Sequence, residues 1–510
     1  MRSTLCLWWI FQYNIIDVKA HSIPYPLLVV FRDHGGVSLI NHFNFSRVAP
    51  NRYLVTNDFG RYLFLSSEEF KRLALGELTQ QDNLYQRLHD NLFIFEPIEL
   101  FSSETAIDLR SMKNYVFSAT ALHIFVLTTA CNLNCVYCQA QDQQNQSKCI
   151  MSASTARKAV DVALQSPAKN LTFEFQGGEP LLNFDVIKEI VHYTEDAKTD
   201  KNVEFTLVSN LSLLTPEIAD FLIEHKVNIC TSIDGPDFIH NRNRKSTSTA
   251  GSYSLMKRGA NLLRDRHYPF GGIQTTTRYS LPFAKEIVQE YYQLGAPGVF
   301  LRPLTPLGFA AADWALIGYT AEEWLSFYKS AFREVLDINR KGAFFPEQHA
   351  VYFLKKILQG HALNYMELRS PCGAGLGQLA YYCDGSIYTC DEARMISESG
   401  DQSFRLGNVY ENSYQDVVSS STCKATCAAS ITESIPGCCD CVYQPYCGIC
   451  PVVSYARDGD IFPRAPGSYR CRIYKGMLDY LFSILDDSTN GEVEILKSWV
   501  EDEDDENKNE

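Results

Sequence analysis

The distribution of cysteine constrains this chain more than any other feature of its sequence. Of the 17 cysteines in 510 residues, 11 fall between Cys372 and Cys471, and the first 371 residues hold only six. A secreted disulfide scaffold is normally a short chain with an even number of cysteines. The odd count, the length and the clustering instead favour a metalloprotein that binds metal or iron–sulfur through thiolates.

Composition and charge exclude several other classes of protein. Hydrophobic residues make up 45% of the chain and charged residues 21%, which excludes collagen-like, coiled-coil and wholly disordered chains. The formal net charge of −14 argues against an extensive nucleic-acid-binding face. No apolar run approaches the ~20 residues that cross a bilayer, and the apolar stretch at 5–11 lacks a signal-peptide cleavage site. We therefore expect a cytoplasmic protein that binds neither nucleic acid nor membrane.

The length corresponds to roughly three domains. Residues 118–330 contain alternating β and α patterns, which predict a parallel sheet that is open or curled toward a barrel. The six candidate strands lie at 122–127, 171–175, 203–208, 228–233, 272–277 and 299–301. The other expected parts are an N-terminal tail at 1–23, an α+β unit at 24–110, a helical linker at 331–365, a cysteine-rich domain at 366–485 and an acidic tail at 486–510.

The strongest chemical signal is Cys131-Asn-Leu-Asn-Cys135-Val-Tyr-Cys138, directly after the first candidate strand. Three thiolates on one loop can hold three irons of a [4Fe–4S] cluster and leave the fourth open for a substrate or cofactor. The position suits catalysis, because chemistry in parallel barrels collects at the C-terminal ends of the strands. Zinc is the weaker interpretation, since structural zinc favours four ligands and paired C-x2-C spacings.

This motif resembles the cluster loop of radical S-adenosylmethionine (SAM) enzymes. The resemblance implies that Cys131, Cys135 and Cys138 ligate the cluster, and that Tyr137 lies near the adenine. In that family SAM chelates the open iron, and its reductive cleavage gives a 5′-deoxyadenosyl radical that abstracts hydrogen from a substrate. The resemblance also implies a partial (β/α)6 barrel and a reductant such as flavodoxin or ferredoxin.

Glycine-rich and polar segments after the later strands extend this resemblance. Gln176-Gly-Gly-Glu-Pro180 resembles the family's GGEP motif, and its two glycines let the backbone approach a ligand closely. Arg244 suits the SAM carboxylate, because a guanidinium matches a carboxylate bidentately, whereas His240 is better interpreted as structural. The residues that the resemblance places at the cofactor are Tyr137, Gly177, Gly178, Glu179, Pro180, Ser209, Asn210, Asp234, Arg244 and Arg302.

The cysteine-rich region resembles the SPASM domain, which holds two auxiliary [4Fe–4S] clusters in radical SAM peptide maturases. The resemblance assigns a distal cluster to Cys438, Cys441, Cys447 and Cys471, and a nearer cluster to Cys372, Cys390 and Cys450. The fourth ligand of the nearer cluster is open between Cys383, a cysteine of the tail, substrate and water. The remaining cysteines are interpreted as free or structural thiols: Cys6, Cys149, Cys230, Cys423, Cys427 and Cys439.

An N-terminal unit, a SAM barrel and a SPASM domain together resemble the layout of maturases for ribosomally made peptides. Segments 300–306 and 438–451 look closest to the maturases of the His-Xaa-Ser repeat system, in which two radical SAM proteins accompany a repeat-bearing precursor peptide. One alternative is an anaerobic sulfatase-maturating enzyme that generates formylglycine. An alternative of another class is an iron–sulfur electron-transfer protein, which needs no SAM pocket.

Two further expectations follow from the resemblance. Sulfatase-type maturases have a catalytic aspartate directly after the cysteine that matches Cys390, so Asp391 is expected in the active-site cavity as a proton acceptor. The alternative is a solvated turn acid. The 24–110 unit is expected to be winged-helix-like, and an exposed strand edge there could add the leader peptide as a further strand. The alternative is a structural cap on the barrel.

Overall fold

The computed structural model describes residues 30–33, 36–96, 103–140, 148–197, 200–360, 363, 365–487 and 491–501. The expected N-terminal tail, Cys6 and residues 488–490 and 502–510 of the expected acidic tail lie outside these residues. The chain divides into two compact units. Unit 1 comprises residues 1–114, 353–363 and 432–447, and unit 2 comprises residues 115–352, 364–431 and 448–510.

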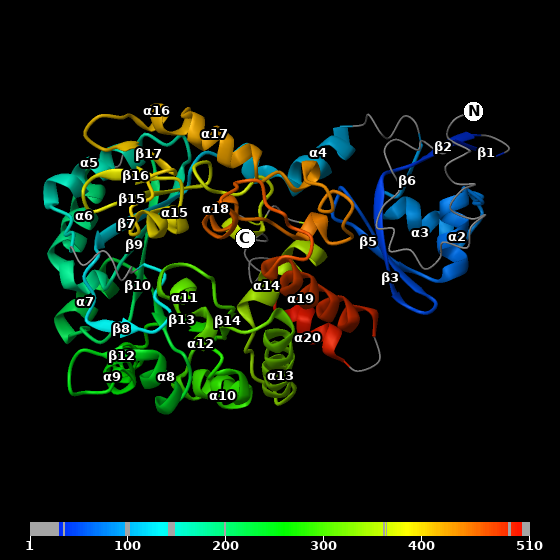
Figure 1. The fold of residues 1–510 in the computed structure, drawn as a ribbon. Helices are drawn as coiled ribbons and strands as arrows, with labels where there is room; N and C mark the ends of the chain where they lie inside the picture. Colours follow the sequence, from blue (N-terminus) through cyan, green and yellow to red (C-terminus); the bar gives the residue numbers. More distant parts are fainter. Residues whose placement is uncertain are drawn as a thin grey trace, which may run out of the picture. The chain divides into compact units, whose positions relative to one another are not determined.

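Unit 2 is built on a sheet with the strand order β14-β13-β11-β10-β9-β7-β15-β16-β17 (Figure 1). Six neighbouring strands in this order are parallel, which confirms the expected mostly parallel sheet. They are β7 (Leu122–Thr128), β9 (Asn170–Gly177), β10 (Asn202–Ser209), β11 (Asn228–Ser232), β13 (Phe270–Thr275) and β14 (Phe300–Arg302).

Amphipathic helices connect these strands and lie outside the sheet (Figure 1). In the first of them Ser152 caps the N-terminus by accepting from Thr155 N, and the buried face includes Ala156 and Val160. The connecting helices are α5 (Ala153–Leu164), α6 (Phe184–Ala197), α7 (Pro216–Glu224), α8 (Asp237–Asn243), α9 (Ser252–Arg264) and α10 (Ala284–Leu294). A two-stranded ribbon of β8 (Leu133–Cys135) and β12 (Arg244–Ser246) is the only other sheet among the described residues of unit 2.

The central sheet continues into the cysteine-rich region. Strand β15 (Gln378–Tyr381) pairs in parallel with β7, and β16 (Ser386–Tyr388) and β17 (Arg405–Asn408) extend the sheet in antiparallel fashion. Helix α13 (Ala321–Arg340) runs across position 331, where the sequence analysis placed a domain boundary. The remaining helices of unit 2 are α11 (Gly308–Ala312), α12 (Trp314–Ile317), α15 (Asp391–Ser397), α16 (Tyr414–Val418), α17 (Ser421–Ala428), α18 (Pro451–Asp458), α19 (Tyr469–Asp486) and α20 (Glu492–Ser498).

Among its described residues, unit 1 contains two small antiparallel sheets and three complete helices. One sheet is β3 (Phe43–Ala49), β4 (Arg52–Asn57) and β5 (Tyr62–Leu65), and the other is β1 (Val30–Asp33), β2 (Gly36–Ile40) and β6 (Ile94–Phe95). The helices are α2 (Ser67–Leu75), α3 (Asn83–Asp90) and α4 (Ser103–Met112), and α14 (Gln348–Leu354) ends in this unit. Ser66 and Glu69 form a capping box at α2. Five strands precede α2 and α3, and the winged-helix assignment stays a prediction.

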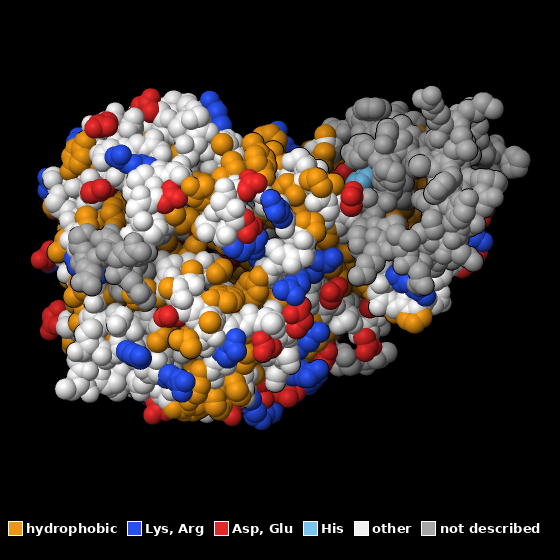
Figure 2. All heavy atoms as spheres, viewed as in Figure 1, with side chains coloured by type: hydrophobic (Ala, Val, Ile, Leu, Met, Phe, Trp, Pro, Cys, Tyr) orange, Lys and Arg blue, Asp and Glu red, His pale blue; other side chains and the backbone are white. Residues whose placement is uncertain are grey.

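On the face shown in Figure 2, acidic and basic side chains of the described residues are interspersed with apolar ones. None of the helices among the described residues is long and apolar enough to cross a membrane.

Candidate functional site

Three thiols meet on the loop that follows β7. Cys131, Cys135 and Cys138 all line a cavity of about 440 Å³. Burial raises the pKa of Cys131 to about 11 and of Cys135 to about 12, and the neighbouring thiols add to both shifts. Cluster binding must therefore displace protons from buried thiols, which iron does by forming strong thiolate bonds. The cavity and the set of three donors fit a [4Fe–4S] cluster with one iron left open.

The two glycines of the Gly-Gly-Glu-Pro motif let the end of β9 pack against the chain that leads into the cysteine loop. A Cβ at Gly177, whose φ is 146°, would lie 2.2 Å from Thr128 O, and one at Gly178 would lie 2.1 Å from Ala130 O. Gly178 N donates to Thr128 O at 2.7 Å, and Glu179 N donates to Ala130 O at 2.9 Å. Any side chain here would push the motif away from the cluster loop.

Glu179, which follows β9, forms hydrogen bonds with residues at the end of β10. Its carboxylate accepts from Ser209 Oγ at 2.7 Å and from Asn210 N at 2.9 Å. The side chain is buried, and burial raises its pKa. Asn210 in turn donates to Asn132 Oδ1 on the cysteine loop at 3.1 Å. Glu179, Ser209 and Asn210 thus line the same cavity as the three thiols, and their role at a cofactor stays a prediction.

Asp234 is the centre of a second buried network. Its carboxylate is fully buried and accepts from Tyr137 Oη at 2.6 Å and from Arg244 Nε at 3.1 Å. Arg244 Nη1 lies 4.0 Å from Cys135 Sγ. Arg244 therefore already has a carboxylate partner within the protein, a feature that the expectation of a SAM carboxylate did not include. His240 is buried and its Nδ1 accepts from Asp234 N at 3.4 Å, as expected of a structural histidine.

Arg302 takes part in a network that the sequence analysis missed. Its side chain pairs with Glu367 and donates to Tyr365 Oη at 3.0 Å. Glu367 also pairs with Arg470 Nη1 at 3.2 Å and accepts from Tyr474 Oη at 2.7 Å. Burial alone would raise the pKa of Glu367, but Arg302 and Arg470 hold it well below its usual range. No sequence motif marks Glu367 or Arg470, because they approach Arg302 only in the folded chain.

A second set of thiols belongs to the cysteine-rich region. Cys372 and Cys450 line a cavity of about 350 Å³, and Cys390 is 1% exposed. Burial raises the pKa of all three thiols, that of Cys372 to about 11. Cys390 and Cys450 each occupy the N-cap position of a helix, α15 and α18. Asp391 begins α15 and lines both this cavity and the 440 Å³ cavity.

Cys383 is not available as a cluster ligand. It forms a disulfide with Cys149, 234 positions away in the sequence. The interpretation of Cys383 as a ligand of the nearer cluster is therefore wrong, because its sulfur is already bonded. Cys149 lies beside the end of β7, where its carbonyl accepts from Thr129 N at 3.0 Å. The remaining alternatives for the fourth ligand stay open at this point.

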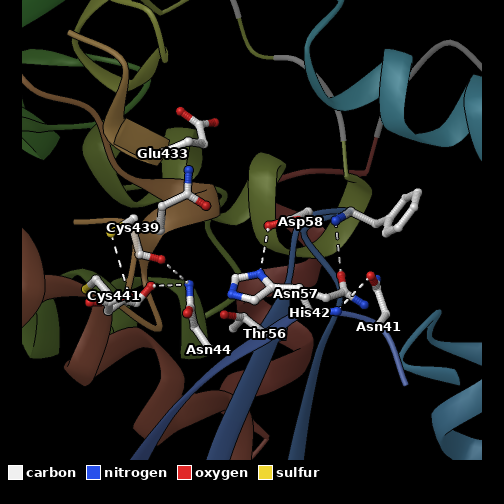
Figure 3. A network of polar contacts seen from close by, with 12 residues as sticks. Asn41, His42, Asn44, Thr56, Asn57, Asp58, Glu433, Cys439 and Cys441 are labelled. Atoms are coloured by element: carbon white, nitrogen blue, oxygen red, sulfur yellow. Dashed lines mark hydrogen bonds and ion pairs between the residues drawn. The ribbon is translucent and has the colours of Figure 1, made fainter. Parts of the chain in front are cut away.

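The described cysteines of unit 1 lie on a loop that β3 and β4 hold by side-chain hydrogen bonds (Figure 3). Asn44 Nδ2 donates to the carbonyl oxygens of Cys439 at 3.0 Å and Cys441 at 3.2 Å, and Thr56 Oγ1 donates to Val442 O at 2.7 Å. This loop carries three of the four residues that the sequence analysis assigned to the distal cluster, Cys438, Cys441 and Cys447. The fourth, Cys471, lies in the first turn of α19 in unit 2.

Comparison with known proteins agrees with this geometry. Residues 125–280 match the model of the radical SAM superfamily. An uncharacterized protein of Methanocaldococcus jannaschii is 31% identical over 183 residues, which cover 36% of this chain and 62% of that protein. The cysteine-type anaerobic sulfatase-maturating enzyme of Clostridium perfringens is 25% identical over 304 residues, which cover 57% of this chain and 77% of the enzyme.

Solved structures of anSMEcpe resemble the fold. The structure with bound AdoMet and the one with AdoMet and the Kp18Cys peptide both have a TM-score of 0.62, at 21% and 20% identity. Each comparison covers 72% of this chain and 98% of the solved chain. The expected similarity to radical SAM enzymes is thereby confirmed for residues 125–280, and the solved structures share the fold.

Proposed function

Because residues 125–280 carry a radical SAM domain, we propose that this chain modifies a ribosomally made peptide by hydrogen abstraction. The observation that carries this proposal is one cavity, lined by the three thiols of the cysteine loop, the Gly-Gly-Glu segment, Arg244 and Asp391. With a [4Fe–4S] cluster and SAM bound there, the cofactors supply a 5′-deoxyadenosyl radical. The protein's task is to hold and orient them.

In this proposal, different residues around the cavity bind the cluster and SAM. Cys131, Cys135 and Cys138 hold the cluster. Glu179, Ser209 and Asn210 offer hydrogen-bonding groups at the ends of β9 and β10, next to the cluster loop. The further residues proposed for the SAM site are Tyr137, Gly177, Gly178, Pro180, Asp234, Arg244 and Arg302. Of these, Asp234 would act by holding Tyr137 and Arg244 in place.

We assign two auxiliary clusters to the cysteine-rich region. Cys372, Cys390 and Cys450 would hold the nearer one. Cys372 and Cys450 line one cavity, and Cys372 and Cys390 are buried, which supports this assignment. The distal cluster would use Cys438, Cys441, Cys447 and Cys471. An auxiliary cluster can accept the electron that a substrate radical loses when it is oxidised.

Asp391 is our candidate for the group that takes up the substrate proton. Its Oδ1 accepts from Arg394 Nε at 2.7 Å, and Arg394 is itself 2% exposed. The buried guanidinium fixes the direction of the Asp391 carboxylate. Since Asp391 lines both cavities, it stands where hydrogen abstraction and electron transfer would meet.

A third cavity, of about 600 Å³, adds aromatic side chains beside the cavity of the three thiols. It shares Arg302 and Glu367 with the wall of the SAM cavity, and it adds the aromatic rings of Trp314, Tyr319 and Tyr469. Aromatic side chains provide large contact areas for a peptide at low conformational cost. We propose a His-Xaa-Ser repeat precursor as that peptide, with a second radical SAM maturase and a flavodoxin or ferredoxin as further partners.

The N-terminal unit remains our candidate for recognition of the leader peptide. Strands β3 and β5 are the edges of its three-stranded sheet among the described residues, and an extended peptide can add to such an edge. Phe64 O on β5 already accepts from Arg87 Nη2 at 3.2 Å, so β3 is the better edge. The alternative role, a structural cap, predicts equal peptide affinity when β3 is blocked.

Sulfatase maturation is the second candidate function. Similarity to the Clostridium perfringens enzyme over 304 residues favours it, as does an aspartate directly after Cys390. The experiment compares two substrates with the reconstituted enzyme, SAM and a reductant: a His-Xaa-Ser repeat precursor and a cysteine- or serine-containing sulfatase peptide. Release of 5′-deoxyadenosine with a mass change in only one peptide identifies the function. An electron-transfer protein would release none.

A further inference from the structure

Glu174 is an acid of the 440 Å³ cavity to which the proposed function gives no role. The side chains of β9 alternate between two faces, so that Phe173 and Phe175 are fully buried while Glu174 and Gln176 face the cavity. Glu174 lines both this cavity and the 350 Å³ cavity of the cysteine-rich region. Its carboxylate therefore belongs to the wall that the two cavities share.

A chain of hydrogen bonds fixes one oxygen of this carboxylate. Arg394, which is 2% exposed and paired with Asp391, donates from Nη2 to Gln176 Oε1 at 3.3 Å. Gln176 Nε2 in turn donates to Glu174 Oε1. Among the described residues, no donor reaches the second oxygen, Oε2. The fold therefore sets the direction of the Glu174 side chain and leaves this oxygen for a ligand.

The positive side chains of the 440 Å³ cavity are already engaged. Among the described residues that line it, the only cations are three arginines, and each forms an ion pair with a different carboxylate: Arg244 with Asp234, Arg302 with Glu367 and Arg394 with Asp391. Glu174 forms no ion pair within the part of the chain that the structure describes. Burial raises the pKa of its carboxyl to about 7, and a cation bound beside it would lower that pKa again. Since buried charges in proteins are paired or bound to metal, a cation that enters with a ligand suits this position.

Two other carboxylates of this cavity also lack an ion pair among the described residues, Glu179 and Glu392. Glu179 accepts three hydrogen bonds, from Ser209 Oγ and from two backbone N–H groups, and the proposed function already places it at SAM. No nitrogen or oxygen donor of another described residue fixes the Glu392 carboxylate. Glu174 is thus the carboxylate with one oxygen fixed and one oxygen open.

We propose that Glu174 is a specificity-determining residue that pairs with a protonated basic side chain of the peptide substrate. This inference rests on the proposed function, and in a His-Xaa-Ser precursor the paired group is the imidazolium of a histidine. A carboxylate that the fold has already oriented binds a cation at a low entropic cost. Hydrogen bonds between charged groups are also stronger than neutral ones. The pairing brings the basic residue of the peptide into the cavity of the cysteine loop.

The test measures peptide binding without turnover. The reconstituted full-length enzyme, with SAM and without a reductant, is titrated with two fluorescent peptides at about pH 6.5, the ordinary pKa of histidine. One peptide has His-Xaa-Ser repeats, and the other has glutamine in place of each histidine. The affinity for SAM is measured separately, because SAM carries a sulfonium and an ammonium group and is the other cation that could pair with Glu174.

The wild type should bind the histidine peptide at least about tenfold more tightly than the glutamine peptide. Glu174→Gln removes the charge but keeps an oxygen that accepts from Gln176. This variant should bind both peptides with the weaker affinity, so that the changes in enzyme and peptide are not additive. Glu392→Gln, the matched control, should keep the preference for histidine. SAM should bind Glu174→Gln as tightly as it binds the wild type.

The outcomes separate the pairing from the proposed function. An undiminished preference for histidine in Glu174→Gln would overturn the pairing, and so would loss of that preference in Glu392→Gln instead. Weaker binding of SAM alone to Glu174→Gln would overturn it as well, because SAM would then be the counter-ion. Failure of the His-Xaa-Ser assignment differs from all of these, since the wild type and both variants would bind neither peptide.

A second measurement tests Glu174 without any peptide. Glu174→Gln should raise the urea midpoint of the full chain at about pH 8, because it removes a charge that has no partner within the protein. Asp391→Asn should lower the midpoint, because Arg394 then loses its partner. A lower midpoint in Glu174→Gln would show that the carboxylate is already paired within the chain. That result would overturn the proposal whichever peptide the enzyme modifies.

Discussion

Tyr137 donates its hydroxyl hydrogen to Asp234 Oδ2 at 2.6 Å, although 97 residues separate them in the sequence. The aromatic residue of the cysteine loop is thus tied to the end of β11. Because Arg244 donates to the other oxygen of the same carboxylate, a single buried acid fixes both side chains beside Cys135. The cluster loop is positioned by the barrel and does not depend on bound iron alone.

Replacing this acid should be costly. Asp234→Asn leaves the Arg244 guanidinium buried without its counter-charge, and we expect it to lose about 3 kcal/mol or more of unfolding free energy. Tyr137→Phe removes one neutral donor and should lose only about 1 kcal/mol. Denaturant unfolding of the two variants measures the difference. Equal losses would show that Asp234 does not hold the charge of Arg244.

The three cysteines of the cysteine loop should be essential for SAM cleavage. Cys131→Ala, Cys135→Ala and Cys138→Ala should each abolish formation of 5′-deoxyadenosine, because each removes a ligand of the reactive cluster. Cys441→Ala should leave SAM cleavage partly intact and weaken peptide turnover. Chromatography of the reaction mixture, with iron analysis of each variant, checks this. Substantial 5′-deoxyadenosine from any of the first three variants would contradict the site.

Asp391 should matter for the peptide and not for SAM cleavage. Asp391→Asn keeps the shape of the side chain but removes the proton acceptor, so we expect uncoupled 5′-deoxyadenosine formation to persist while peptide product falls by about 10²-fold or more. The ratio of product to 5′-deoxyadenosine is the readout. Full peptide turnover in Asp391→Asn would exclude a role for this carboxylate in the mechanism.

The loop of the distal cluster should depend on Asn44. Asn44→Asp keeps the shape of the side chain but replaces its two donors to Cys439 O and Cys441 O with an anion, which should cost about 1–3 kcal/mol. We expect less iron in the purified protein and faster loss of it to a chelator. Asn41→Asp is the matched control (Figure 3), because Asn41 donates to Leu92 O, away from the loop. Equal iron content in the two variants would mean that the loop keeps its conformation without the hydrogen bonds from Asn44.

His123 should make the protein sensitive to acid. Burial lowers the pKa of this fully buried imidazole from 6.5 to about 3, so the folded chain keeps it neutral while the unfolded chain takes up a proton below pH 6.5. Stability contributed by His123 is therefore lost as the pH falls, by about 2 kcal/mol at about pH 5. His123→Phe should flatten this dependence, and His267→Asn, at an exposed position, should not. Urea midpoints between about pH 7 and pH 5 provide the measurement.

Local sequence patterns predicted the parts of this molecule that are local in the chain. The six parallel strands, the capping box of Ser66 and Glu69 and the thiols beside the Gly-Gly-Glu segment all follow from short motifs or periodicity. The missed features join distant segments. The Cys149–Cys383 bond spans 234 positions, and Glu367 meets Arg302 and Arg470 only after folding. Such pairs leave no mark in a single sequence.

The hydrogen bonds between β7 and β15 limit how chimeras of this protein can be designed. The strand that leads into the cysteine loop, β7, pairs in parallel with β15, the first strand of the cysteine-rich region. A chimera that exchanges that region between two such enzymes must break and re-form a parallel register from Gln378 with Leu122 to Tyr381 with Phe125. We expect grafts that carry β7 and β15 from the same parent to fold, and grafts that split them to expose two unpaired edges and aggregate.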